Sequence, residues 1–213
     1  MQKTTILITS LALIILCLIL ASCGEEKKVE SPKQELLKSY VDIIKKDQFV
    51  IQFKSQEKIE DKLVDAVVTI AHKSKKEMVS VLSGDLDMKI VVKDKKVYNV
   101  IHSTEMVMVL ANKEDDINDY DLETIFKEIN IKEHFVGSGS EQIKGKEYFY
   151  EEYKNNDEKQ SLIRFYFEGD SLKYIKKFGS DPKDDNILEI LEFSSLVPDS
   201  LFDIPSGYQL KGI

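Results

Sequence analysis

The chain has 213 residues, a formal net charge of −8 and a pI near 5.1, and all of its basic side chains except Arg164 are lysines. An acidic chain without a basic cluster in its sequence does not attract polyphosphate, which argues against nucleic acid as a partner. A chain of this length buries a real core without help from disulfides or metals.

Residues 1–22 have the pattern of a cleavable export signal. Lys3 makes the first residues basic, an apolar run extends from Leu11 to Ala21, and small residues precede a charged segment. This run is shorter than the roughly 20 apolar residues that a membrane-spanning helix needs. We therefore expect residues 1–22 to be removed, which takes away Lys3 and changes the net charge from −8 to −9.

Residues 20–23, Leu-Ala-Ser-Cys, resemble the lipobox of bacterial lipoproteins. The resemblance implies that the thiol of Cys23 carries diacylglycerol and that its amine is open to a further acyl chain. Acyl chains contribute about 0.8 kcal/mol per buried methylene, so two or three chains hold a protein firmly at a membrane. We expect an extracytoplasmic, lipid-anchored protein with no other cofactor. The alternative is an ordinary secreted protein in which a cysteine falls at this position by chance.

The polar residues 23–31 predict a tether, and residues 32–213 predict a single domain. Ser31 and Pro32 are a typical helix start, and apolar residues at helical spacing predict a helix over about 32–46. From Gln48 onward the apolar period changes to two, which predicts a meander of antiparallel strands with turns at Gly84-Asp85 and Asp94-Lys95. A second helix is expected over 121–129, and strands then resume. The pattern gives about ten strands and two helices.

The later strands resemble a known family. The segments "SLIRFYFEGDSLKYIKKFG" and "ILEILEFSSLVPDSLFDIPSGY", most specifically residues 198–208, resemble the outer-membrane lipoprotein carrier and receptor (LolA/LolB-like) superfamily. The resemblance implies an α+β, mainly β fold: a curved antiparallel sheet, an unclosed barrel of about ten to eleven strands, covered by two or more helices. It further implies an apolar cavity that binds lipid or an acylated peptide without catalysis. The family's basic transfer residue has no counterpart here, because Arg164 does not stand in a matching motif.

Methionines are concentrated on the predicted strands, and their flexible thioethers suit adaptable apolar pockets. Together with neighbouring apolar residues they are the candidates for a ligand cavity: Met88, Ile90, Val92, Met106, Met108, Phe165 and Phe167. The alternative is that these residues form ordinary core.

No set of residues in the sequence predicts catalysis or a metal site. His72, His102 and His134 lack the spacing of metal ligands and are expected at the surface or at strand ends. Glu147 and Glu151 alternate with tyrosines and are expected on the solvent face of a strand.

The leading hypothesis is therefore a non-enzymatic lipoprotein that binds a hydrophobic ligand. The alternative is an interaction module that binds and regulates a cell-envelope or spore-cortex enzyme. Lipidated relatives of the resembled family in spore-forming bacteria include germination lipoproteins that act in this way, by activating a cell-wall amidase.

Overall fold

The computed structural model describes residues 36–59, 62–111, 134–154, 161–179 and 185–212. All of them belong to one compact unit, Lys33–Ile213. Within these ranges no helix has both the length and the apolar character needed to cross a bilayer. The predicted signal, the tether, Cys23 and the helix expected over 121–129 lie outside the described residues.

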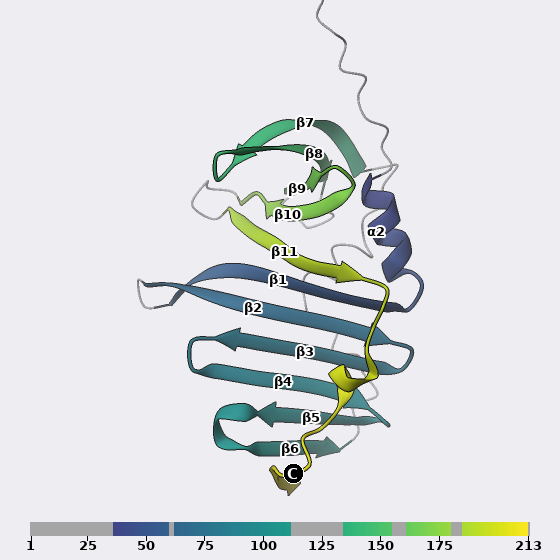
Figure 1. The fold of residues 1–213 in the computed structure, drawn as a ribbon, viewed down its shortest axis with the longest axis vertical. Helices are drawn as coiled ribbons and strands as arrows, with labels where there is room; N and C mark the ends of the chain where they lie inside the picture. Colours follow the sequence, from purple (N-terminus) through teal and green to yellow (C-terminus); the bar gives the residue numbers. More distant parts are fainter. Residues whose placement is uncertain (1–35, 60–61, 112–133, 155–160, 180–184, 213) are drawn as a thin grey trace, which may run out of the picture. The chain divides into compact units, whose positions relative to one another are not determined.

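Twelve strands form one sheet, with the order β12-β6-β5-β4-β3-β2-β1-β11-β10-β9-β8-β7 (Figure 1). Their bounds are β1 Gln48–Ile59, β2 Lys62–Lys73, β3 Lys76–Ser83, β4 Leu86–Lys93, β5 Lys96–Ile101, β6 Met106–Ala111, β7 Phe135–Ile143, β8 Lys146–Lys154, β9 Leu162–Glu168, β10 Ser171–Lys177, β11 Asn186–Ser194 and β12 Gln209–Gly212. Every pair of neighbours is antiparallel except β12 and β6, which run parallel. The predicted fold class, a mainly β chain built on a large, curved and unclosed sheet, is confirmed.

The strand count exceeds the expected ten to eleven because β12, with only four residues, adds to β6 at the edge of the sheet. One α-helix is described, α2 (Leu36–Ile44), which falls within the predicted 32–46. Two short 3-10 helices are also described, η1 (His102–Thr104) and η3 (Asp199–Phe202).

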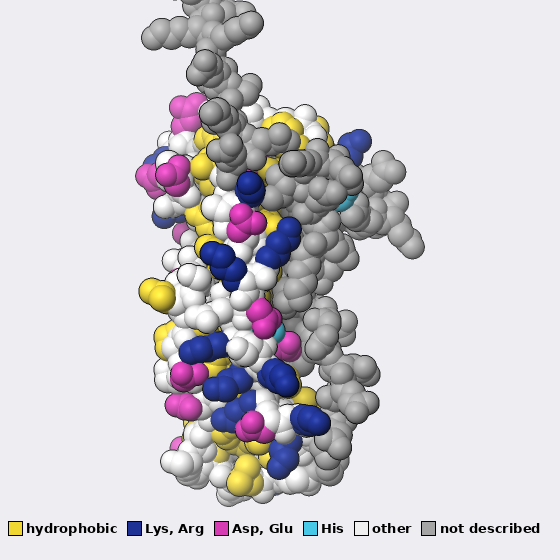
Figure 2. Space-filling model, turned by 90° about the vertical axis from the view of Figure 1, so that its right-hand side faces the viewer, with side chains coloured by type: hydrophobic (Ala, Val, Ile, Leu, Met, Phe, Trp, Pro, Cys, Tyr) yellow, Lys and Arg dark blue, Asp and Glu magenta, His cyan; other side chains and the backbone are white. Residues whose placement is uncertain are grey.

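The strands β1 to β6 form the predicted meander. Gly84-Asp85 joins β3 to β4 and Asp94-Lys95 joins β4 to β5, as the sequence predicted. Asp94 and Lys95 both have positive φ, 53° and 60°, which is the backbone that a two-residue type I′ hairpin requires. In a meander every second connection returns to the same rim of the sheet, and the rim where β1 begins and β2 ends faces the viewer in Figure 2.

One face of the sheet packs against α2. The helix buries Leu37, Val41 and Ile44 against Phe49 and against the other apolar residues of the same strand face. Its apolar positions fall at helical spacing, so one stripe of the helix meets the sheet while Lys38 and other polar residues remain exposed. Burying each large apolar side chain contributes about 1.5–3 kcal/mol.

The opposite face is crossed by residues 195–208, which we call the C-terminal strap. Val197 and Phe202 of the strap are buried against Val50, Met78 and Val91 of the sheet. Side chains of the strands also hold the strap by its backbone carbonyls. The donors and acceptors are Gln48 Nε2 to Ser195 O (2.9 Å), Lys73 Nζ to Val197 O (3.1 Å), Lys93 Nζ to Phe202 O (2.9 Å) and Lys89 Nζ to Asp203 O (2.8 Å).

Replacing Phe202 by alanine should therefore lower the free energy of unfolding by about 3–5 kcal/mol, because it empties a site that is only 1% exposed. Leu196→Ala is the matched control in the same strap, since Leu196 is 79% exposed and should change stability by no more than about 0.5 kcal/mol. Urea unfolding followed by circular dichroism measures both. Equal losses for the two variants would show that the strap does not pack as described.

Candidate binding site

The seven candidate cavity residues share one face of the sheet. The pairing register from β1 to β6 runs without a shift, so cross-strand partners form straight rows on a common face. One row is Ile51, Ile70, Val79, Ile90, Asn99 and Met108, and parallel rows contain Met88 with Met106 and Val92 with Leu110. Phe165 and Phe167 on β9 belong to the same apolar cluster as Ile51 and Ile70.

Burial divides this face into two parts. Phe165 and Phe167 are 0% and 1% exposed and pack in the cluster that contains the buried residues of α2. The five candidates on β4 and β6 are half-buried: Met88, Ile90, Val92, Met106 and Met108. The structure therefore brings the predicted residues to one face but gives them two environments, a filled core beneath α2 and a partly accessible apolar surface on β4 to β6. We call the second part the apolar strand face.

A pocket of about 260 Å³ lies on the opposite face, beside the strap. Its floor is one cross-strand row of polar side chains that the sequence reading did not single out: Glu192, Gln52, Thr69, Ser80 and Lys89. Gln52 Nε2 donates a hydrogen bond to Thr69 Oγ1 (3.0 Å). Burial lowers the pKa of Lys89, while the nearby Asp203 acts in the opposite direction. The rest of its lining is largely apolar and includes Val50, Met78 and Leu201, so the pocket offers both polar and apolar contacts. The sheet separates it from the apolar strand face.

The predicted solvent position of Glu151 is wrong, although Glu147 is exposed as expected. Glu151 is 0% exposed, and its Oε2 accepts hydrogen bonds from the backbone N–H of Leu37 (3.2 Å) and from the hydroxyl of Tyr153 (2.9 Å). The first turn of a helix has unpaired N–H groups, so a carboxylate placed there caps it and suits the helix dipole. Glu151 thus ties α2 to β8 across 114 residues of sequence.

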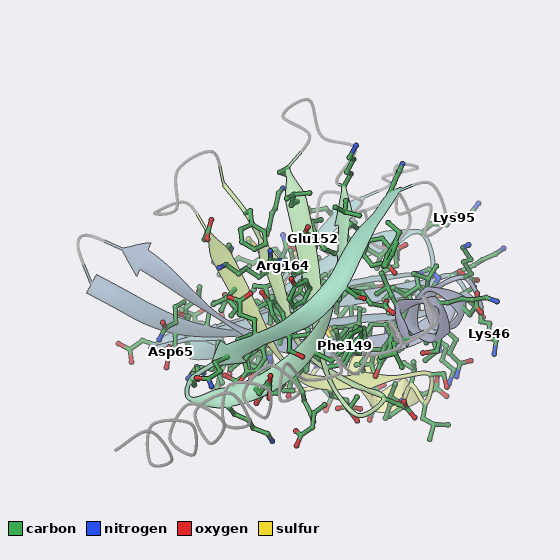
Figure 3. All side chains as sticks on the ribbon, turned by 90° about the horizontal axis from the view of Figure 1, so that it is seen from above. Lys46, Asp65, Lys95, Phe149, Glu152 and Arg164 are labelled. Atoms are coloured by element: carbon green, nitrogen blue, oxygen red, sulfur yellow. The ribbon has the colours of Figure 1, made fainter. Side chains whose placement is uncertain are left out.

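Arg164 has a structural position in the sheet. Its guanidinium bonds Glu152 (2.5 Å) and Glu141 (2.6 Å) and lies over the rings of Tyr150 and Phe178, as Figure 3 shows for Arg164 and Glu152. Burial disfavours the charged form of Glu141, but hydrogen bonds from Tyr166 and Arg164 outweigh it and hold the pKa of Glu141 below its usual value. These partners hold the guanidinium in place against β8.

The three histidines stand at or beside strand ends, as predicted. His72 lies between Asp47 (Nε2 to Oδ1, 2.5 Å) and Glu77 (Nδ1 to Oε1, 3.7 Å), and His102 Nδ1 is 2.8 Å from the hydroxyl of Tyr208. Within the described ranges no three His, Cys, Asp or Glu side chains gather in the way that a metal site requires.

No protein-family model and no curated protein matches the chain. Among solved structures it is similar to an uncharacterized conserved protein from Thermus thermophilus, with 12% identity and a TM-score of 0.46 over 83% of this chain and 98% of that one. It is also similar to a chain of the MucA/MucB complex from Pseudomonas aeruginosa, with 9% identity and a TM-score of 0.44 over 84% of this chain and 63% of that one. A LolA superfamily protein from Nitrosomonas europaea is 11% identical, with a TM-score of 0.34 over 80% of this chain and 97% of that one. At TM-scores below 0.5 these similarities carry no argument about function.

The pKa of Tyr153 makes its contact with Glu151 measurable. Burial, followed by the charge and the hydrogen bond of Glu151, raises the pKa of Tyr153 above its ordinary value of 10.0. Above about pH 10, Tyr153 keeps a proton in the folded protein that it loses in the unfolded chain. Its contribution to the free energy of unfolding is therefore complete below about pH 10 and decreases as the pH rises further. Tyr153→Phe should therefore make the alkaline decrease in unfolding free energy shallower, as measured by urea unfolding at several pH values. Tyr98→Phe, on half-buried Tyr98, is the control; equal slopes for wild type and Tyr153→Phe would contradict the assignment.

Proposed function

We propose that this protein is a membrane-anchored extracytoplasmic lipoprotein that binds a hydrophobic ligand, a lipid or an acylated peptide, without catalysis. The observation that supports the ligand most strongly is the apolar strand face. Its five candidate residues lie in register on the same side of the sheet as the filled core, yet they keep part of their surface accessible.

The two parts of the face differ in what covers them. The cluster that contains α2 holds residues exposed by 0–9%, such as Phe53 at 8% and Ile190 at 7%. On β4 to β6 the same rows continue with apolar side chains, except at Asn99, which is polar. Contiguous apolar surface of this kind is typical of binding sites, and methionine adapts to ligands of variable shape. An acyl chain gains about 0.8 kcal/mol for each methylene that it buries there.

The membrane anchor is proposed from the sequence. The lipobox-like residues end at Cys23, directly after an apolar run of signal-peptide length. An anchored binding domain would meet lipids and acylated proteins at the surface where they are concentrated. The anchor and the ligand therefore belong to one function.

A labelled fatty acid supplied to producing bacteria should appear in the purified protein, and Cys23→Ala should abolish the label. The reason is that acylation needs the thiol of this residue. Protein recovered after membrane extraction and gel electrophoresis gives the measurement. Cys17→Ala is the control, because Cys17 lies inside the predicted signal and should leave the label unchanged. Label that persists in Cys23→Ala would contradict the anchor.

Polar substitutions on the apolar strand face should weaken the binding of the ligand. In the double variant Met88→Gln and Met108→Gln, we expect the dissociation constant of a fluorescent fatty acid to rise by about 30–150-fold, because two thioether contacts of about 1–1.5 kcal/mol each are lost. Fluorescence titration measures it. Leu82→Gln is the control on the other face of β3, where Leu82 is 52% exposed. Equal affinities for the double variant and wild type would exclude this face as the site.

The second candidate function is a module that binds and regulates an envelope or spore-cortex enzyme. It is favoured by exposed leucines away from the apolar strand face, Leu196 at 79% and Leu210 at 70% exposure. Isolated exposed leucines are common on monomers, so this support is weaker than a contiguous surface. Crosslinking in the native host that captures an enzyme through these leucines, together with failure to bind fatty acid, would favour the second function.

A further inference from the structure

The structure gathers lysines that are scattered in the sequence. These lysines lie in three connections at one rim of the sheet, where β1, β3 and β5 begin and β2 and β4 end. The connections are 45–47, 73–76 and 93–96. They carry eight lysines: Lys45, Lys46, Lys73, Lys75, Lys76, Lys93, Lys95 and Lys96. We call this edge the lysine rim; Figure 2 shows basic side chains along it, and Figure 3 shows Lys46 and Lys95 on the same side. The sequence itself shows no basic cluster because these lysines come from three separate connections.

Charge differs between the two rims of β3 to β6. The described connections at the opposite rim, 83–87 and 102–105, carry Asp85, Asp87 and Glu105 and contain no lysine. Asp65, near that rim and far from Lys46 and Lys95 in Figure 3, pairs with Lys54 (2.7 Å), and Lys62 begins β2 there. The strands β3 to β6 thus have a basic rim opposite turns that carry acids and no lysine, although the whole chain has a net charge of −8.

The lysines of the rim have two roles. Lys73, Lys76 and Lys93 are half-buried and hold the strap, and the first two also pair with Asp199, whose pKa they keep below its usual value. The other five are exposed: Lys45, Lys46, Lys75, Lys95 and Lys96. Four described carboxylates share the rim, Asp47, Glu77, Asp94 and Asp199, so lysines outnumber acids there by eight to four.

The chemistry of the rim fits a broad anionic surface. Lysine ammonium groups act as hydrated point charges, whereas recognition of a single phosphate usually employs the bidentate fork of arginine, which is absent from the rim. Because the three turns lie along one rim, their lysines form a row of positive charges that can face a flat anionic surface. The remainder of this acidic chain is repelled by an anionic plane, so the lysine rim is the side that approaches it most closely.

We propose that the lysine rim rests against the anionic headgroups of the membrane in which Cys23 is anchored and thereby orients the domain. This proposal rests on the anchored lipoprotein proposed above. Twelve residues separate Cys23 from Leu36, the first described residue, and twelve residues span at most about 40 Å when extended. This limit keeps the domain near the bilayer, where headgroup charge acts over about 8 Å at physiological salt. In this orientation the turns that carry Asp85 and Glu105 point away from the bilayer.

Amine acetylation of the full-length lipoprotein in vesicles tests the orientation. The protein is reconstituted in phosphatidylcholine alone or mixed with phosphatidylglycerol, and mass spectrometry gives the acetylation rate of each lysine. The five exposed rim lysines should react several-fold more slowly in the anionic vesicles, and high salt should remove this protection. Lys144 and Lys146, 69% and 54% exposed on the β7–β8 hairpin, should react equally in both.

Variants sharpen the test. The triple change Lys75→Gln, Lys95→Gln and Lys96→Gln should remove the protection of Lys45 and Lys46, whereas Lys144→Gln with Lys146→Gln should preserve it. Equal rim reactivity in both vesicle types, with the protein floating in each, would overturn the orientation and leave the anchor intact. Protein that fails to float with vesicles would overturn the anchor and the orientation together. Protection that requires an added anionic wall polymer would assign the rim to that polymer and overturn the proposal.

Discussion

The register of the antiparallel pairing from β1 to β6 is the constraint on which the rest of this structure depends. Ile51 pairs with Ile70, Ile70 with Val79 and Val79 with Ile90, and no shift interrupts the rows. Because side chains alternate between faces, a slip of one residue would exchange the two faces of a strand. The same register fixes which turns share a rim. The apolar strand face, the pocket beside the strap and the lysine rim are therefore three consequences of one pairing pattern.

The two covers of the sheet are held by different forces. The helix α2 presents an apolar stripe, and its N-terminal N–H at Leu37 is bound by the buried Glu151. The strap buries fewer apolar side chains and depends on lysines that donate to its carbonyls. On the helix side the cluster beneath α2 is filled, while the residues of β4 and β6 stay half-buried. The apolar face of the sheet is therefore covered unevenly, with its part on β4 and β6 left partly accessible.

The sequence predicted what depends on local pattern. The period of two and the turns at Gly84-Asp85 and Asp94-Lys95 were enough for the meander, and helical spacing was enough for α2. Long-range partners could not be predicted in the same way. Glu151 alternates with tyrosines like a solvent-facing residue, yet its partner Leu37 is 114 residues away in sequence.

The sequence indicated which candidate residues share a face, but it did not indicate how deeply each of them is buried. The alternation of Met88, Ile90 and Val92 shows that they share a face, but only the three-dimensional arrangement shows that Phe165 lies under α2 while they do not. The lysine rim was missed because its residues come from three separate turns, and each turn alone is an ordinary solvated loop. The strand β12 was missed because its four residues are too few to show a period.

The central claim, that the apolar strand face takes a hydrophobic ligand, is tested most directly by crosslinking with a photoactivatable fatty acid, followed by peptide mapping. The claim predicts that crosslinks concentrate on residues 86–93 and 106–111, the strands β4 and β6, and that unlabelled fatty acid competes them away. Crosslinks found mainly on the strap and its neighbouring pocket, or spread evenly over the surface without competition, would contradict it.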